Sequence, residues 1–371
     1  MNTKTNVKTN VETNALEYAK LCCDTIIKKF PDADLPPVGK FHYHAGVFLS
    51  GMERVYMMCG DKKYNNYIKK WLDFYIDKDG NSVGVNDEEF DDIEPSNLVI
   101  RYLENGEERY RKHLERYVPL LLSWKCNELG GLWHKMWFPN QMWLDSLYMA
   151  GPLAVRYGIM TGNREYIKLI HRQLMLMWEN MRDGKTGLLY HAWDQSKKAE
   201  WVTKSDGCSE EFWGRAIGWY LVATCDISEL LSDDEPLKKD FTDNAAALAK
   251  SLINFRDEKS GAWYQVVDKG YRDDNWIETS CTCLYIYGIS NLVRRGLLGK
   301  EYEEYADKAY KEIIENQTEI KDGQLTVKNI CIGTGVGDYE FYINRPRTQN
   351  DLHGTGAFTL MCTEYAAMKN R

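Results

Sequence analysis

The sequence predicts an all-α protein, an (α/α)6 barrel built from six helical hairpins. Segments with apolar residues at helical spacing fill most of the chain, and strand patterns are few and short. Similar loops recur between these segments, which indicates a repeating unit of two helices. No Pro/Gly/Ser-rich linker or block of charge divides the chain, so the helix pairs are expected to form one structure.

About twelve segments have the apolar periodicity of amphipathic helices. In chain order they cover residues 14–30, 43–59, 63–77, 95–105, 107–125, 142–161, 163–181, 211–231, 237–255, 278–296, 300–316 and 354–369. Short turns such as Thr161-Gly162-Asn163 join some neighbours, and long loops rich in aromatic and polar residues join others. This alternation predicts about six stacked helix pairs.

The long loops share one plan, in which a helix ends, the chain turns on glycine, and hydrophobic residues lead into the next helix. Such loops occupy residues 79–84, 128–133, 182–190, 256–264 and 321–325, at a spacing of roughly fifty residues. Because they all precede the same member of each pair, they are expected to gather at one rim around a central pocket. This pattern favours a closed ring over the competing architecture, an open solenoid.

The chain is predicted to have two parts, a disordered polar tail over residues 1–14 and a single catalytic domain over residues 15–371. The tail is rich in Thr and Asn and lacks the apolar core of a signal peptide, and no later run is long enough to span a membrane. The 10 cysteines show neither a disulfide framework nor zinc spacing. These features predict a cytoplasmic enzyme with reduced thiols.

Composition and net charge narrow the classes of molecule that this protein is expected to bind. A net charge of −8 argues against nonspecific attraction to nucleic acid. The 12 tryptophans and 24 tyrosines suit sugar rings, which stack on flat aromatic faces. The expected partner is a small-molecule carbohydrate, with no nucleic acid and no membrane; the sequence makes no prediction about oligomeric state.

One stretch, residues 130–149, combines a Gly-Gly turn, an aromatic loop and a helix with an acid in its first turns. Asn140 is predicted to cap a helix that continues from Met142. Asp145 lies among apolar neighbours, which disfavour its ionised form, so its pKa is expected to rise toward the range of a general acid. The alternative is that Asp145 only caps a helix or bonds a neighbouring loop.

Other polar side chains recur where loops meet inner helices. They include His42, Tyr43, His44, Asp91, Asp92, His134, Lys135, His191, Trp213, Arg215 and Glu278. Two carboxylates, several histidines, one arginine and many aromatic rings indicate acid–base chemistry on a negatively charged sugar. Structural roles compete with this interpretation: the aspartates can cap the helix near Pro95, and lone histidines are often buried structural groups.

Other kinds of site fit the sequence less well. The run His42-Tyr43-His44 has no nearby ligand at zinc spacing, so no metal is predicted. The glycine-rich stretch from Gly333 to Gly337 lacks the Lys-Ser/Thr of a phosphate-binding loop, and a nucleophile elbow is absent. No cofactor is implied.

Five motifs resemble those of the unsaturated rhamnogalacturonyl hydrolases, glycoside hydrolase family 105, which is related to the unsaturated glucuronyl hydrolases of family 88. They are GGLWHK (130–135), QMWLDSLYM (141–149), FWGRAIGW (212–219), GVGDYEFY (335–342) and NDLHGTGAF (350–358). The resemblance runs from about Tyr43 to the C-terminal helix. It implies an (α/α)6 barrel that removes the unsaturated uronic acid left by a lyase at a non-reducing end.

The resemblance also implies roles for single residues. Asp145 takes the place of the general acid/base, and Asp91 that of a second active-site aspartate, with Asp92 as the alternative. The substrate-binding positions fall on Tyr43, His134, Lys135, His191, Trp213 and Arg215. Asp145, kept protonated partly by repulsion from Asp91, would then protonate C4 of the C4=C5 double bond while water attacks C5. Arg215 would hold the substrate carboxylate through a bidentate pair.

Several alternatives share these residues. The same reaction on an unsaturated uronide from glycosaminoglycan or ulvan differs only in the leaving sugar, for which rhamnose is the expectation. A sugar epimerase on the same barrel would use two histidines that flank one carbon. A noncatalytic carbohydrate-binding barrel would leave the double bond of the substrate intact.

Overall fold

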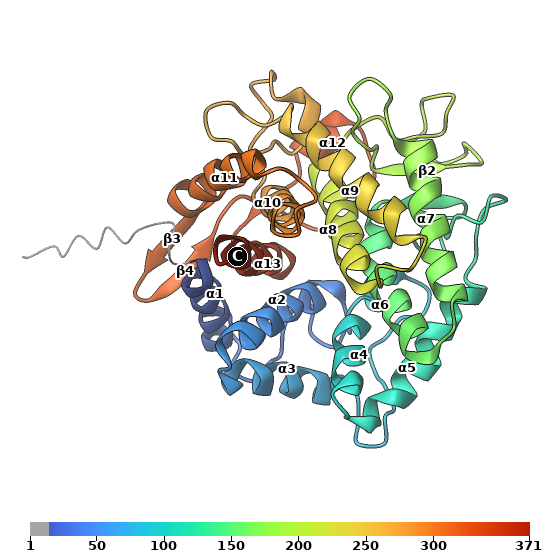
Figure 1. Cartoon of the computed structure of the whole chain (residues 1–371), viewed down its shortest axis with the longest axis vertical. Helices are drawn as coiled ribbons and strands as arrows, with labels where there is room; N and C mark the ends of the chain where they lie inside the picture. The colour runs from blue at the N-terminus through green and yellow to red at the C-terminus, as the bar shows by residue number, and fades with distance from the viewer. Residues whose placement is uncertain (1–14) are drawn as a thin grey trace, which may run out of the picture.

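The computed structural model describes residues 15–371 and contains mainly α-helices (Figure 1). The tail predicted to be disordered, residues 1–14, lies outside the described residues. Six helices form the inner layer of a ring: α2 (Tyr43–Cys59), α4 (Ser96–Glu104), α6 (Asp145–Thr161), α8 (Gly214–Leu230), α10 (Thr279–Arg294) and α13 (Leu352–Lys369). Each contacts the next in chain order, and α13 contacts α2. The ring is therefore closed, as predicted, rather than an open solenoid.

Six outer helices alternate with the inner ones along the chain. They are α1 (Ala15–Lys29), α3 (Lys62–Tyr75), α5 (Arg111–Tyr117), α7 (Glu165–Met181), α9 (Lys238–Ile253) and α11 (Glu303–Asn316). The two layers differ in burial for a physical reason. An outer helix packs on the ring with one face only, whereas residues 279–293 of the inner helix α10 are all buried because neighbours surround them.

Short strands form three antiparallel pairs at the loops. They are β1 (Gln141–Trp143) with β2 (Ala192–Asp194), β3 (Thr318–Lys321) with β4 (Gln324–Val327), and β5 (Ile330–Cys331) with β6 (Arg347–Thr348). A short helix, α12 (Tyr339–Ile343), lies between β5 and β6 in the chain. The sequence prediction did not include the β3–β4 hairpin or α12.

Two predicted helices differ from the structure. The segment predicted over 107–125 contains 3₁₀ turns at Glu108–Tyr110 and Val118–Ser123 on either side of α5. Pro119 accounts for the second change, since proline cannot donate the backbone hydrogen bond of a helix interior. The helix predicted from Met142 begins at Asp145 instead, because residues 141–143 form β1. Asn140 is therefore not its N-cap; it has a φ of 64° in the turn before β1.

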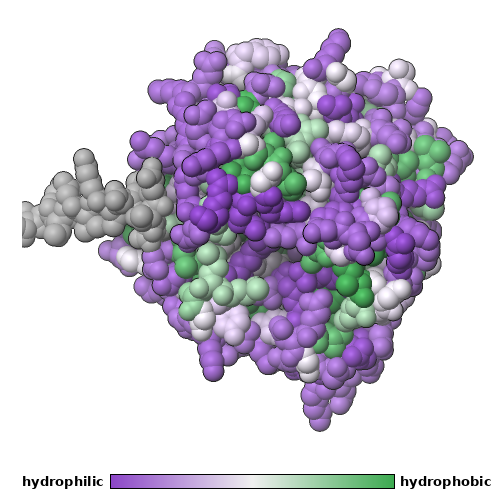
Figure 2. Space-filling view, in the orientation of Figure 1, coloured by the Kyte–Doolittle hydropathy of each residue, from purple (hydrophilic) through white to green (hydrophobic). Residues whose placement is uncertain are grey.

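All ten cysteines are free thiols and most of them are buried, as the sequence predicted. Among residues 15–371, the helices are either too short or too polar to cross a lipid bilayer. The face of the molecule in Figure 2 is mostly hydrophilic, with small apolar patches between polar side chains.

Candidate active site

A pocket of about 350 Å³ opens at the mouth of the ring where the inner helices begin. Tyr43 is the first residue of α2 and Asp145 is the first residue of α6. Helix N-termini carry partial positive charge, so this mouth favours anionic side chains and ligands. The side chains and glycines that line the pocket are His42, Tyr43, His44, Asp91, His134, Lys135, Trp137, Phe138, Trp143, Asp145, Met149, Gly333, Thr334 and Gly335.

Pairing of β1 with β2 brings Asp145 and His191 together. Trp143 lies opposite Ala192 in this pair, and the backbone N–H of Leu144 donates to the carbonyl of His191. The side chain of Asp145, the next residue, then lies beside that of His191, with His191 Nε2 3.2 Å from Asp145 Oδ2. His191 Nδ1 lies 2.8 Å from the hydroxyl of Tyr342, which fixes the ring orientation.

The structure does not bear out the raised pKa expected for Asp145. Burial alone would raise the pKa of this carboxyl, which is 8% exposed. The neighbouring His191, followed by His134, outweighs burial and holds the pKa of Asp145 below its ordinary value. The apolar neighbours of Asp145 along the chain predict a raised pKa, but its histidine partner comes from a different loop. In the free protein Asp145 is therefore ionised.

Asp91 is the second carboxylate of the pocket. It lies in a 3₁₀ turn, Phe90–Asp92, and its Oδ2 is 2.5 Å from Lys135 Nζ. Lys135 also contacts Glu89 at 2.5 Å, and His134 Nε2 lies 3.7 Å from Asp91 Oδ1. Burial would raise the pKa of Asp91, but His134 and Lys135 lower it below its ordinary value. Asp91 is thus also ionised, so it does not keep Asp145 protonated in the free protein.

The neighbouring Asp92 has different contacts. Its Oδ2 accepts a hydrogen bond from the backbone N–H of Asn86 at 3.1 Å, and burial raises the pKa of Asp92 to about 7. Asp92 does not line the pocket, whereas Asp91 does. The lining of the pocket therefore favours Asp91 over Asp92, and its role as the second active-site carboxylate stays a prediction.

Stacked rings form one wall of the pocket. The ring of His134 lies against Trp143, with centroids 4.4 Å apart and planes 17° apart, and Phe138 also stacks on Trp143, at 5.4 Å. His134 is fixed by a 2.9 Å contact between its Nδ1 and the hydroxyl of Ser146. A flat apolar wall next to carboxylates suits a sugar ring, which has an apolar face and polar edges.

Three predicted site residues lie behind this surface. His191 and Trp213 are fully buried, with ring centroids 4.6 Å apart, and Trp213 stacks on Tyr342. Arg215 is also buried, and its two Nη atoms donate to the backbone carbonyls of Cys331 and Ile332 at 2.5 and 2.7 Å. The same two Nη atoms are those predicted to hold a substrate carboxylate; in this structure they contact the backbone, and the bidentate role of Arg215 stays a prediction.

Arg215 fixes the start of the glycine-rich loop that begins at Gly333. Gly333, Thr334 and Gly335 directly follow the two carbonyls and line the pocket. Arg345 holds the same loop through the carbonyl of Gly333 and the hydroxyl of Thr334, at 3.1 Å for the latter. The run of glycines was a signal for close approach of backbone to a ligand, although it is not a phosphate-binding motif.

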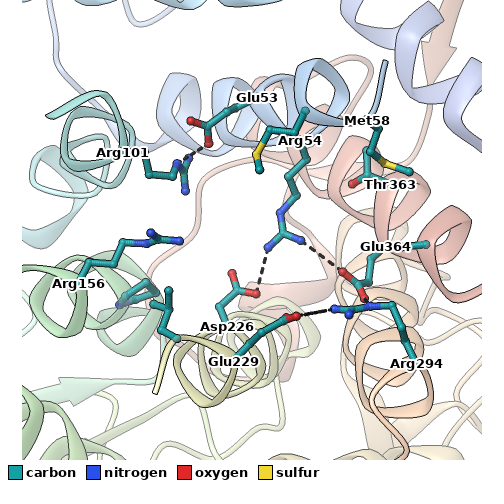
Figure 3. Close-up of a pocket in the computed structure, with 14 residues that line it drawn as sticks. Glu53, Arg54, Met58, Arg101, Arg156, Asp226, Glu229, Arg294, Thr363 and Glu364 are labelled. Atoms are coloured by element: carbon teal, nitrogen blue, oxygen red, sulfur yellow. Dashed lines mark hydrogen bonds and ion pairs between the residues drawn. The ribbon is translucent and has the colours of Figure 1, made fainter. Parts of the chain in front are cut away.

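A second pocket, of about 380 Å³, lies at the opposite mouth of the ring (Figure 3). It is lined from all six inner helices and contains none of the predicted site residues. Figure 3 shows Arg54 reaching between Asp226 and Glu364, at 3.1 and 3.3 Å. Arg294 contacts Glu364 and Glu229 at 2.5 and 2.9 Å. Most acids and arginines of this mouth therefore pair with one another, and Arg156 pairs with Glu104 outside the pocket lining.

Comparison with known proteins supports the chemistry suggested by the first pocket. The sequence profile of Glycosyl Hydrolase Family 88 matches residues 18–369. A glycoside hydrolase of family 105 from C. acetobutylicum has a solved structure that is 33% identical, with a TM-score of 0.89, and the match covers 94% of this chain and 99% of that one. Unsaturated rhamnogalacturonyl hydrolase YesR of Bacillus subtilis is 25% identical over 320 residues, 84% of each chain.

More distantly related solved structures share this fold. Unsaturated glucuronyl hydrolase from Bacillus sp. GL1 is 14% identical, with a TM-score of 0.70 over 94% of this chain and 95% of that one, and it shares the helical ring. The profile match over nearly the whole chain is to family 88, and the 33% identical structure is a member of family 105. This chain belongs to the glycoside hydrolases of the related families 88 and 105.

Proposed function

We propose that this glycoside hydrolase removes unsaturated galacturonic acid from the non-reducing end of rhamnogalacturonan fragments produced by a lyase. The observation that carries the reaction type is the pair of buried carboxylates, Asp91 and Asp145, beside an aromatic wall. The similarity to YesR supports the choice of rhamnogalacturonan as the polymer. Cytoplasmic action on small fragments is part of the proposal.

The substrate ring is a vinyl ether with a carboxylate at C5, and the reaction is a hydration of its C4=C5 bond. Asp145 donates a proton to C4, and positive charge develops at C5 and the ring oxygen. Water adds to C5 and returns a proton to the Asp145 carboxylate. The resulting hemiketal opens, and rearrangement of the open form releases the leaving sugar, rhamnose in rhamnogalacturonan. Atoms balance with one water consumed.

Asp145 must gain a proton before this step, because His191 keeps it ionised in the free protein. Binding of the substrate accounts for this protonation. Its carboxylate brings a negative charge next to two aspartates and its ring displaces water, and both changes raise the pKa of a buried acid. Asp91, held by Lys135, is placed to accept hydrogen bonds from sugar hydroxyls.

The substrate carboxylate is proposed to meet the loop from Gly333 to Gly335 rather than Arg215 itself. This loop lines the pocket, and helix N-termini at the same mouth favour an anion there. Arg215 acts on binding through the carbonyls that it holds immediately before the loop. In this role Arg215 is a positioning residue, with Tyr43 contacting the sugar from the first turn of α2.

A panel of unsaturated disaccharides tests the proposal. The protein is mixed with disaccharides prepared by lyases from rhamnogalacturonan, chondroitin and ulvan, and the ultraviolet absorbance of the conjugated double bond is followed. We expect loss of absorbance, with the highest kcat/KM on the rhamnogalacturonan product. A higher kcat/KM on another disaccharide would reassign the substrate, and unchanged absorbance on all three would reject hydration.

A further inference from the structure

Three side chains that the proposed reaction does not use gather where the ring closes. His44 is the second residue of α2, Asp351 directly precedes α13, and His353 is the second residue of α13. One ring nitrogen of each histidine and one carboxylate oxygen all lie within 4.8 Å of one another. Within residues 15–371, no other group of His, Cys, Asp or Glu side chains meets this condition.

The hydrogen bonds of His353 determine which of its nitrogens carries hydrogen. Nε2 lies 3.0 Å from the backbone carbonyl of Cys331, which can only accept, so Nε2 is the N–H. In the neutral ring Nδ1 then presents a lone pair, and Nδ1 lies 2.7 Å from Asp351 Oδ1. Both atoms are fully buried, and neither has a hydrogen-bond partner among the described residues. The lone pair on His353 Nδ1 and the carboxylate oxygen of Asp351, both acceptors, therefore face each other.

His44 presents a third acceptor to the same point. The Nδ1 atom of His42 accepts from the backbone N–H of His44, so the Nδ1 of His44, 2.9 Å away, is the donor between the two rings. The lone pair of His44 is consequently on Nε2, which lies 3.7 Å from Asp351 Oδ1.

Asp351 Oδ1 is the point on which the two imidazole rings converge. It lies 2.7 Å from His353 Nδ1 and 3.7 Å from His44 Nε2. The other nitrogen of each ring contacts a second partner, the Cys331 carbonyl or His42. Three lone pairs that converge in this way repel one another unless a cation lies between them.

We propose that His44, Asp351 and His353 bind a divalent transition metal ion, with Zn²⁺ as the representative ion. Two imidazoles and one carboxylate suit such a metal and leave a coordination position for water. The two separations from Asp351 Oδ1, 2.7 and 3.7 Å, lie on either side of the roughly 3.3 Å expected between ligands of a tetrahedral zinc ion. The Cys331 carbonyl and His42 orient the two rings, as partners of metal-bound histidines do.

The position of the proposed metal site predicts the effect of metal binding on stability. Its ligands come from α2 and α13, the first and last inner helices, which pack together to close the ring. A metal ion bound there connects two segments from opposite ends of the chain and stabilises the closed ring. The sequence alone missed the site, because His44 has no metal ligand near it along the chain.

Calorimetry tests this proposal. Full-length protein, treated with chelator and dialysed, is titrated with ZnCl₂ and, separately, with MgCl₂. We expect one equivalent of Zn²⁺ to bind and raise the melting temperature, and Mg²⁺ not to bind. Asp351→Asn and His353→Gln should weaken Zn²⁺ affinity by more than the ~10–100-fold typical for loss of an outer partner. Asp351 makes no side-chain cap bond in α13, so Asp351→Asn preserves the helix.

Two control variants separate this site from other places where zinc can bind. Cys126→Ser removes the exposed thiol, and Asp145→Asn changes the catalytic pocket; both should keep the wild-type affinity. Co²⁺ bound to wild-type protein should show visible bands without the near-ultraviolet charge transfer of thiolate ligands. Failure to bind one equivalent, unchanged affinity in Asp351→Asn and His353→Gln, or a thiolate spectrum would each overturn the proposal.

Discussion

At the scale of single residues, partners from other loops decide the ionisation of the acids in the pocket. Asp145 and Asp91 are both buried, and burial alone would make them weak acids. A histidine and a lysine reverse this tendency and leave both carboxylates charged in the free protein. The general acid is therefore expected to be formed only when substrate binds.

Replacement of Asp145 by Asn tests its role in proton transfer. Because asparagine cannot donate or accept the proton, kcat should fall by about 10²–10⁴-fold, the usual contribution of general acid–base catalysis. Circular dichroism and melting should match those of wild type. The matched control is Asp240→Asn, which changes a surface aspartate that contacts His171. Substantial turnover by a folded Asp145→Asn variant would assign the proton to another group.

The pH dependence of the two kinetic parameters tests whether substrate protonates Asp145. The pKa of Asp145 is lowered in the free protein, and a substrate carboxylate should raise it in the complex. Since the protonated form is active, kcat should decline at higher pH than kcat/KM does. With a methyl ester of the substrate, which lacks the negative charge, the separation should shrink. Coincident profiles with the charged substrate would contradict this account.

Glu94 provides a test of stability against pH. Its side chain is buried, its Oε2 has no hydrogen-bond partner among the described residues, and burial raises its pKa to about 8. Between the unfolded value of 4.5 and about 8, the folded protein holds a proton that the unfolded chain has lost. Its contribution to stability is therefore present below pH 4.5 and is lost as the pH rises toward 8.

Substitution of Glu94 by Gln replaces the titrating carboxyl group with a neutral amide. Relative to the variant, wild type should lose up to about 1.4 kcal/mol of unfolding free energy per pH unit across that window. Urea unfolding at several pH values between 5 and 8 measures the difference. Glu88→Gln, at an exposed glutamate, is the control and should show no such trend. A difference that does not change with pH would indicate that Glu94 is already ionised.

At the scale of elements, close helix contacts and short strand pairs place the site. The β1–β2 pair brings the start of α6 next to His191, and the contact of α2 with α13 closes the ring. Glycine allows this last contact, since a Cβ atom on Gly356 of α13 would lie 2.7 Å from the backbone nitrogen of Phe48 in α2. That distance is shorter than normal packing permits.

Gly356→Ala is expected to push α13 away from α2 and to lower the free energy of unfolding by about 1–3 kcal/mol. Denaturant titration measures the change. Gly184→Ala is the matched control because a Cβ atom there meets nothing within 4 Å, and its effect should stay within about 0.5 kcal/mol. Equal stability of the two variants would show that the helices separate easily at this point.

At the scale of the whole molecule, the two mouths of the ring have opposite characters. One mouth gathers helix N-termini, carboxylates and aromatic rings around the proposed catalytic pocket. The other gathers arginines and acids that pair across the inner helices (Figure 3). Cationic side chains near helix C-termini are favourable, so this mouth stabilises the ring.

Glu364→Gln tests that division of roles. Glu364 is 3% exposed and accepts from both Arg54 and Arg294, so its neutralisation leaves two partly exposed arginines with fewer partners. Stability should fall by about 1–2 kcal/mol, reduced from a fully buried pair by solvent screening. Thermal melts and kcat/KM on the same samples should show lower stability with unchanged catalysis. A large loss of kcat/KM without loss of stability would place a functional site at this mouth.

The sequence by itself determined most of the helices, their pairing and the acids and aromatic residues of the pocket. Apolar periodicity is a local signal, and closure follows from the repeated plan of the loops. Five of the eight predicted site residues line one pocket, namely Tyr43, Asp91, His134, Lys135 and Asp145.

Only the tertiary structure decided the charge of Asp145, the contacts of Arg215 and the cluster around Asp351. Each depends on contacts between residues far apart in the chain, such as Asp145 with His191 or His44 with Asp351. The pKa of an acid and the partner of an arginine are set by atoms within a few ångströms, and the chain order does not specify which loops supply those atoms. Periodicity determines which residues enter the core; packing determines which of them meet.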